Sequence, residues 1–249
     1  MDPHHLAELV ESVGEPADDT RSRAAALARL VAALGRSARS AGLGAVAAGR
    51  WLTDTVIEVS PSLAVRDRAA LRRQYPNQSD SAIAEHLVAT AMKASAAIGA
   101  AAGGLSAVEF VAPPALLAVP VQLAAETLCV VAIELKMVAE LHEIAGVPAT
   151  GTRRDQAGAY LVAWMRRRVV DPAAAGQGLA AVLGVATKRE LRGVLLRRVG
   201  RSATSVAPFL AGAVAGAEFN RRATRSMGAR LLAELRADLN HNDPRIIDG

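Results

Sequence analysis

The chain has 249 residues, of which 51% are hydrophobic and only 3% aromatic, so one large domain can bury a substantial core of mostly small side chains. The net charge is +5, the acidic N-terminus excludes a secretory signal, and the single cysteine, Cys129, excludes an intramolecular disulfide. Alanine has the highest helix propensity, whereas strands favour β-branched and aromatic residues. We therefore predict an all-α fold, a compact multi-helix bundle with long Ala/Gly-rich central helices, in a cytoplasmic protein.

The N-terminal segment, residues 1–20, is acidic and contains Pro3, Gly14 and Pro16, so it is predicted to be a short helix or a disordered arm. Residues 21–245 are predicted to form a single helical domain. Hydrophobic periodicity, caps and proline or glycine breaks mark its helices. In chain order these are Thr20–Leu34, Trp51–Val59, Arg66–Arg73, a helix that opens within Asn77–Ser81 and runs to Gly103 and Gly104, a helix that opens at Pro113 and Pro114 and ends at His142 or Ile144 with Pro120 as a kink or true start, Arg153–Val170, Pro172–Ala186, Lys188–Gly200 and Ser205–Leu239.

Four stretches without charged residues raise the question of membrane insertion. They are Ala94–Val108, Phe110–Ala125, Pro172–Thr187 and Ser202–Ala217. Each is shorter than the roughly 17 to 20 apolar residues that a membrane-spanning helix needs. Two interpretations stay open, namely buried helices of a soluble core and segments that insert partly into a membrane.

Glycines four residues apart occur in two of these stretches, as Gly99 with Gly103 and Gly212 with Gly216. In a helix this spacing places both glycines on one face, where the backbone of another helix can approach closely. The sequence therefore predicts tight helix pairing at these four positions, whether the surroundings are lipid or protein.

The resemblance to a known family rests on three segments. Residues 75–84 (Tyr-Pro-Asn-Gln-Ser-Asp-Ser-Ala-Ile-Ala), residues 114–126 with the small-residue run before them, and residues 208–222 (Pro-Phe-Leu-Ala-Gly to Asn-Arg-Arg) resemble the EcsC family over roughly residues 50–240. The resemblance implies a helical, membrane-associated protein that serves a transport, secretion or envelope process. It supplies no catalytic residues.

Catalytic and metal-binding motifs were sought without success. The zinc motif HExxH and the di-iron spacing ExxH are absent, and no glycine-rich phosphate loop or nucleophile elbow occurs. We therefore predict no metal and no cofactor, and the sequence identifies no catalytic residue. An enzyme with a site around Glu126 and His142 is still one alternative, which ranks below membrane binding and below a soluble interaction module.

Polar side chains in the apolar helix after Pro114 form a second group of candidates. Gln122, Glu126 and Glu134 fall close to one helix face, and buried carboxylates must be paired or protonated. The partner is expected to be Lys93, Arg50 or an arginine from the second half of the chain. The group is interpreted as an ion pair that fixes helix register or as a polar pocket or ion path.

Basic residues dominate the second half, with fifteen Arg or Lys against four Asp or Glu between Arg153 and Arg230. The candidates for a membrane-binding surface are Arg166, Arg167, Arg168, Arg197, Arg198, Arg221 and Arg222. Basic residues beside apolar stretches are typical of helices that meet anionic lipids. We therefore expect the protein to bind an anionic membrane surface at the inner face of the cell membrane. A membrane protein is expected as a further partner there. The alternative is a soluble helical interaction module that binds nucleic acid, although the arginines lack interleaved aromatic residues.

Overall fold

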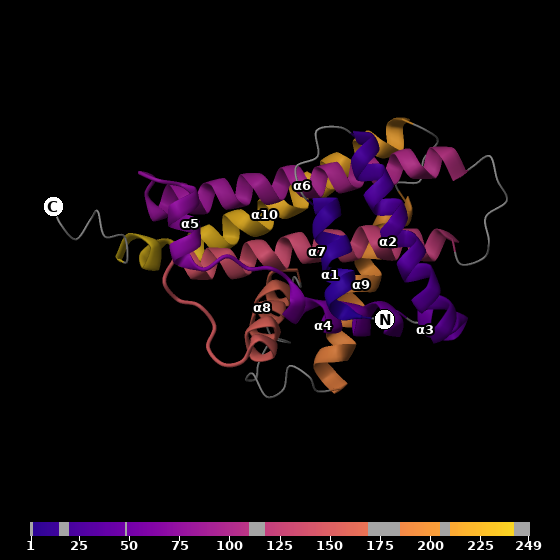
Figure 1. The fold of residues 1–249 in the computed structure, drawn as a ribbon, viewed down its shortest axis with the longest axis horizontal. Coiled ribbons are helices and arrows are strands. Elements are labelled where there is room, and N and C mark those ends of the chain that lie inside the picture. The colour runs from indigo at the N-terminus through magenta and orange to yellow at the C-terminus, as the bar shows by residue number, and fades with distance from the viewer. Residues whose placement is uncertain are drawn as a thin grey trace.

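Three long helices run along the length of the molecule (Figure 1). They are α6 (Asp80–Glu109), α7 (Ala118–Ile144) and α10 (Leu210–His241). The computed structural model describes residues 2–14, 20–47, 49–109, 118–168, 185–204 and 210–241. Every regular element in this part of the chain is helical, which confirms the predicted all-α bundle with long central helices.

The remaining elements pack around these three helices. They are α1 (Pro3–Gly14), α2 (Thr20–Ala41), α3 (Leu43–Ala47), α4 (Arg50–Val59), the 3-10 helix η1 (Ser60–Ser62), α5 (Arg68–Gln74), α8 (Arg153–Arg168) and α9 (Val185–Thr204). In Figure 1, α1 and α2 cross the long helices, and α4, α8 and α9 lie on the α7 side of the bundle. Most bounds agree with the hydrophobic periodicity to within a few residues.

The N-terminal segment is a packed helix, one of the two forms expected for it. Leu6, Ala7, Val10 and Val13 of α1 are at most 2% exposed and belong to the same hydrophobic cluster as the residues of α7. The spacing of these residues gives α1 an apolar face, and its acidic residues lie outside that face. Residues 3–14 are therefore part of the helical body, and the acidic character of the segment describes only its outer side.

Local backbone chemistry accounts for the places where helices begin and end. Helix α2 continues past Gly35 and ends before Gly42, whose φ of 85° favours glycine. Helix α5 begins after Asp67, whose side chain accepts a hydrogen bond from the backbone N–H of Ala70, so Arg66 precedes the helix predicted to include it.

Pro120 lies in the first turn of α7 as the structure describes it, and the residues before Ala118 lie outside the described part of the chain. The residues expected to form a separate helix from Pro172 to Ala186 lie outside the described part of the chain, except that α9 includes the last two of them.

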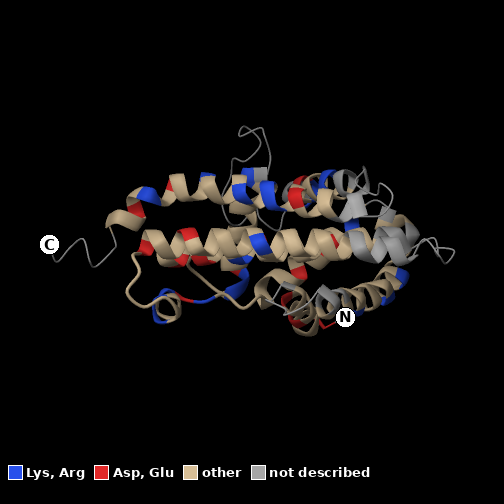
Figure 2. Cartoon of the chain, turned by 90° about the horizontal axis from the view of Figure 1, so that it is seen from above, with Lys and Arg blue, Asp and Glu red and all other residues tan. Residues whose placement is uncertain are grey.

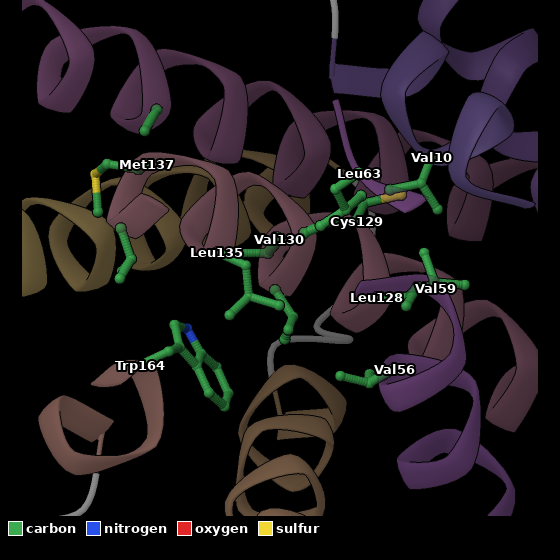
Figure 3. Close-up of a cluster of buried hydrophobic side chains, with 14 of the residues drawn as sticks. Val10, Val56, Val59, Leu63, Leu128, Cys129, Val130, Leu135, Met137 and Trp164 are labelled. Carbon is green, nitrogen blue, oxygen red and sulfur yellow. The ribbon is translucent and has the colours of Figure 1, made fainter. Parts of the chain in front are cut away.

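Helix α7 forms the centre of the core. Nearly all of its side chains from Val121 to Ile144 are buried, because other helices pack around it. Figure 3 shows its Cys129 beside Val10 of α1 and Leu63 of the segment after η1, and Trp164 of α8 reaching toward Leu135. Among the described helices, none has the length and apolarity needed to cross a membrane.

The antiparallel pair α6 and α10 makes the most extensive helix contact of the described structure. A Cβ atom added to Gly99 would lie 2.5 Å from the carbonyl oxygen of Gly216, and one added to Gly228 would lie 2.5 Å from Cγ1 of Val88. Real Cβ contacts are longer than this, so these glycines allow the two backbones to approach. The close contact expected from glycine spacing is thus observed at Gly99 and Gly216, whereas the surroundings of Gly103 and Gly212 lie outside the described residues.

Candidate functional site

Helix α7 carries the buried polar side chains that the sequence singled out. Gln122 is 7% exposed, Glu126 8% and Glu134 0%. The Gln122 side chain donates a hydrogen bond from Nε2 to the carbonyl oxygen of Ala102 in α6, at 3.2 Å. The bond ties α7 to α6 near the end of their contact.

Glu134 is bound by two other helices. Its Oε2 atom accepts a hydrogen bond of 2.8 Å from Nε1 of Trp164 in α8, and its Oε1 atom accepts one of 2.8 Å from the hydroxyl of Thr224 in α10. All three side chains are fully buried. A buried carboxylate that accepts such bonds fixes the relative positions of the three helices, because displacement of any one would leave a polar group without its partner.

Glu126 belongs to a second network, which reaches the basic half of the chain. Asn220 of α10 donates from Nδ2 to Oε1 of Glu126 at 3.1 Å, and Arg198 of α9 donates from Nη2 to Oδ1 of Asn220 at 2.8 Å. Burial raises the pKa of Glu126, while the hydrogen bond from Asn220 and the charge of Arg198 lower it. The expected arginine partner is therefore Arg198, which acts through an amide placed between the two charges.

Arg198 was expected on a membrane-facing surface, and that expectation is wrong. Its residue is 3% exposed, and its guanidinium lies inside the bundle against Asn220. The neighbouring Arg197 is exposed. Successive helical residues point about 100° apart, so one residue of a dibasic pair faces the core when the other faces outward. Burying this cation is compatible with folding because a hydrogen-bond acceptor and a carboxylate lie close to it.

The three candidate arginines of α8 differ in their surroundings. Arg166 is exposed on α8, Arg167 is half-buried and pairs with Glu234 of α10, and the side chain of Arg168 lies outside the described residues. Arg167 therefore joins two helices of the bundle.

Arg221 and Arg222 of α10 are exposed, and both pair with Glu218 on the same helix. The two arginines lower the pKa of Glu218 through their hydrogen bonds. One carboxylate between two guanidiniums leaves this part of α10 with net positive charge. Figure 2 shows several Lys or Arg positions, in blue, along α10, the helix that leads to the C-terminus.

The outward side of α10 also carries apolar residues. Val214 is 71% exposed and Phe219 is 37% exposed, and both precede the exposed Arg221, Arg222 and Arg225. We call these five residues the α10 outer face. Val214, Arg221 and Arg225 are separated by seven and four residues, which places them on one side of a helix.

The histidine candidates are part of separate packing contacts. Nδ1 of His142 lies 2.7 Å from the carbonyl oxygen of Val138, and its ring contacts that of Tyr160 in a tilted arrangement with the ring centres 5.5 Å apart. His86 has a similar arrangement with Tyr75 at 5.4 Å. Burial is the main cause that lowers the pKa of His142. Among the described residues, no group of three or more His, Cys, Asp and Glu side chains is arranged to hold a metal ion.

Sequence reasoning missed two ion-pair clusters around α5. Asp80, 2% exposed at the first turn of α6, accepts from Arg68 at 2.6 Å and from Arg72 at 2.7 Å. Arg66 forms a bidentate pair with Glu140 of α7, at 2.6 and 2.8 Å. The first cluster had a sequence signal, namely a run of arginines before a helix that starts with an acid. The second had none, because Glu140, the partner of Arg66, is remote from it in the sequence.

No protein-family model, curated protein or solved structure matches this chain in the three comparisons made. The EcsC resemblance therefore rests on the sequence motifs alone.

Proposed function

We propose that this protein associates peripherally with anionic membranes at the cytoplasmic face of the cell membrane, through the α10 outer face. The observation that carries the proposal is the combination of exposed Val214 and Phe219 with exposed Arg221, Arg222 and Arg225 on one helix. An amphipathic surface of this kind binds a membrane by burying apolar side chains at the headgroup level while cations meet anionic lipids.

The size of the electrostatic contribution depends on the free charge of this face. Each basic residue near an anionic surface contributes about 1 kcal/mol, and Glu218 offsets part of that contribution for Arg221 and Arg222. The expected attraction is therefore modest and sensitive to salt, and the apolar pair Val214 and Phe219 adds to it. Reversible binding of this strength suits an accessory protein of a transport, secretion or envelope process, as the EcsC resemblance implies.

The test is flotation of the purified protein with vesicles that contain increasing fractions of anionic lipid. Binding should rise with the anionic fraction, weaken with salt and fall strongly in the triple variant Arg221→Glu, Arg222→Glu, Arg225→Glu. The matched control reverses three exposed arginines of α2, Arg29, Arg36 and Arg39, which changes the net charge equally but lies elsewhere on the surface.

Different outcomes would refute different parts of the proposal. Absence of flotation would reject membrane association, and equal losses in the two triple variants would mean that net charge alone is responsible. Replacement of Val214 and Phe219 by serine should reduce binding even at low salt, because it removes the apolar contribution. Unchanged binding in that variant would exclude insertion of this face into the headgroup region.

A further inference from the structure

The segment between η1 and α5 is held against α1 and α7 by two side chains of opposite charge. The Oε1 atom of Glu11 in α1 accepts a 2.6 Å hydrogen bond from the backbone N–H of Ala64, and Nζ of Lys136 in α7 donates a 2.6 Å bond to the carbonyl oxygen of Ala64. A carboxylate and an ammonium are thereby fixed on either side of one residue. Their positions are set by α1 and α7, which pack directly on each other.

A cavity of about 320 Å³ opens beside this segment, between α1, α5, α6 and α7. One part of its wall is apolar and comes mainly from the facing sides of α6 and α7. This part comprises Val10, Leu87, Ala91, Ala94, Ile133 and Met137. Small-molecule sites have volumes of roughly 300 to 1,000 Å³ and combine an apolar wall with a few fixed polar groups, and this cavity lies at the lower end of that range.

The charged part of the wall is balanced, with Glu11 and Glu140 against Arg66 and Lys136. Arg66 is already engaged, because its guanidinium binds Glu140 twice and also donates to Gln74. Glu140 is 2% exposed and faces Arg66. These two charges neutralise each other and leave little capacity for a further partner.

Glu11 and Lys136 keep unused hydrogen-bonding capacity. The Lys136 ammonium has three N–H donors and makes one hydrogen bond among the described residues, because its distance to Glu140 is 4.0 Å. Glu11 uses one of its two carboxylate oxygens, to Ala64. One remaining acceptor and two remaining donors thus line the same cavity as the apolar wall.

We propose that this cavity binds a small zwitterionic molecule with an apolar tail. Its ammonium group is placed at Glu11, its acidic group at Lys136, and its tail against α6 and α7. A ligand with a single net charge is disfavoured, because it would meet a like charge at Glu11 or Lys136 and bury an uncompensated ion in a wall whose own charges cancel.

Two sources of this chemistry are available in a cell, and the experiment separates them. One is a free α-amino acid with an apolar side chain, and the other is a zwitterionic lysophospholipid. The probes are 2-aminooctanoic acid for the first and short-chain lysophosphatidylethanolamine, below its micelle concentration, for the second. Octanoic acid and octylamine supply a similar tail with one charge only.

Titration calorimetry on the full-length protein measures the four affinities. At least one zwitterion should bind, and octanoic acid and octylamine should bind at least about tenfold more weakly, since a single unpaired charge costs at least that factor. Failure of both zwitterions to bind would overturn the proposal, as would equal binding of octanoic acid or octylamine. The zwitterion that binds identifies the source.

Two variants locate the binding at this cavity. Lys136→Gln removes the ammonium and should reduce zwitterion affinity by about tenfold or more while affecting octylamine little. Ala94→Leu fills the apolar part without touching the charged residues and should abolish binding. Ala89→Leu is its matched control, because Ala89 is also half-buried on α6 but does not line the cavity. If Ala94→Leu and Ala89→Leu bind the zwitterion equally, the site is elsewhere and the proposal is wrong.

Discussion

The α6–α10 contact and the buried polar side of α7 connect the same helices by opposite means. Between α6 and α10, the decisive feature is the absence of side chains at Gly99 and Gly216, which lets the two backbones touch. On α7, Glu134 projects a carboxyl group into the core, where it accepts hydrogen bonds from Trp164 and Thr224. A larger side chain would disrupt the glycine contact, whereas loss of a hydrogen-bonding partner would disrupt the network around Glu134.

The comparison shows how an alanine-rich core specifies one arrangement of helices. Small residues alone allow many similar packings, because alanine faces fit one another in several registers. A glycine contact excludes registers that would place a side chain between the backbones, and a buried carboxylate excludes those that leave its partners unbonded. Substitutions at the glycine contact and at the buried polar groups should therefore destabilise the protein for different reasons.

The largest effect is expected for Gly99→Leu, because its Cβ alone would lie 2.5 Å from a backbone oxygen that cannot move away. The cost should exceed the about 1–3 kcal/mol of ordinary overpacking, and Gly216→Leu should behave similarly. Gly99→Ala should cost more than Gly216→Ala, whose Cβ would lie 3.2 Å from its nearest neighbour. Urea denaturation gives these free energies of unfolding.

Gly35→Ala is the control for the glycine substitutions. Gly35 lies within α2, and the nearest atom to its added Cβ is 3.9 Å away, an ordinary contact. Alanine there should stabilise the protein by about 0.5–1 kcal/mol through helix propensity. If Gly99→Ala also stabilised it, the close approach of α6 and α10 would be disproved.

Glu134→Leu should be the most damaging change on the polar side of α7. It keeps the apolar bulk but removes the acceptor of both the Trp164 and the Thr224 hydrogen bonds, at about 1–3 kcal/mol for each affected group. Glu134→Gln retains one carbonyl acceptor and should cost less. Equal stability of the leucine variant and the wild-type protein would show that this network contributes nothing to folding.

Arg198 and Arg197 provide an internal pair for the third prediction. Arg198→Gln removes a charged donor from a buried bond to Asn220 and should cost about 1.5–3 kcal/mol. Arg197→Gln changes an exposed residue one position away and should fall within about 0.5 kcal/mol of the wild-type protein. Thermal unfolding of the two variants under identical conditions measures the difference, and matching melting temperatures would contradict the burial of Arg198.

The smallest effect is a pH dependence that arises from His142. Burial lowers its pKa in the folded protein, so the unfolded chain binds the proton more readily. The contribution of His142 to the free energy of unfolding is therefore largest above the pKa of the unfolded chain, about 6.5. This contribution decreases as the pH falls through that value. Between about pH 7.5 and about pH 5.5 the wild-type protein should lose more stability than His142→Gln. An identical loss in both proteins would assign the pH dependence to other groups.

The helices themselves could be predicted because their signals are local. Alanine content, proline breaks and hydrophobic spacing predicted the central helices. The four-residue spacing of Gly99 with Gly103, and of Gly212 with Gly216, predicted the close contacts that are observed at Gly99 and Gly216. The extended segment that contains Ala64 could not be predicted, because its hydrogen bonds go to Glu11 and Lys136, which are remote in the sequence.

Local sequence patterns were sufficient to predict that this chain is helical and that α7 has to bury carboxylates. The folded structure was needed to learn that Gly99 and Gly216 meet each other, that Glu126 reaches Arg198 through Asn220, and which of two adjacent arginines is exposed. The two kinds of information act over different distances along the chain. Helix propensity and hydrophobic spacing act within a few residues, whereas the burial of a side chain depends on how a whole helix is rotated against its neighbours.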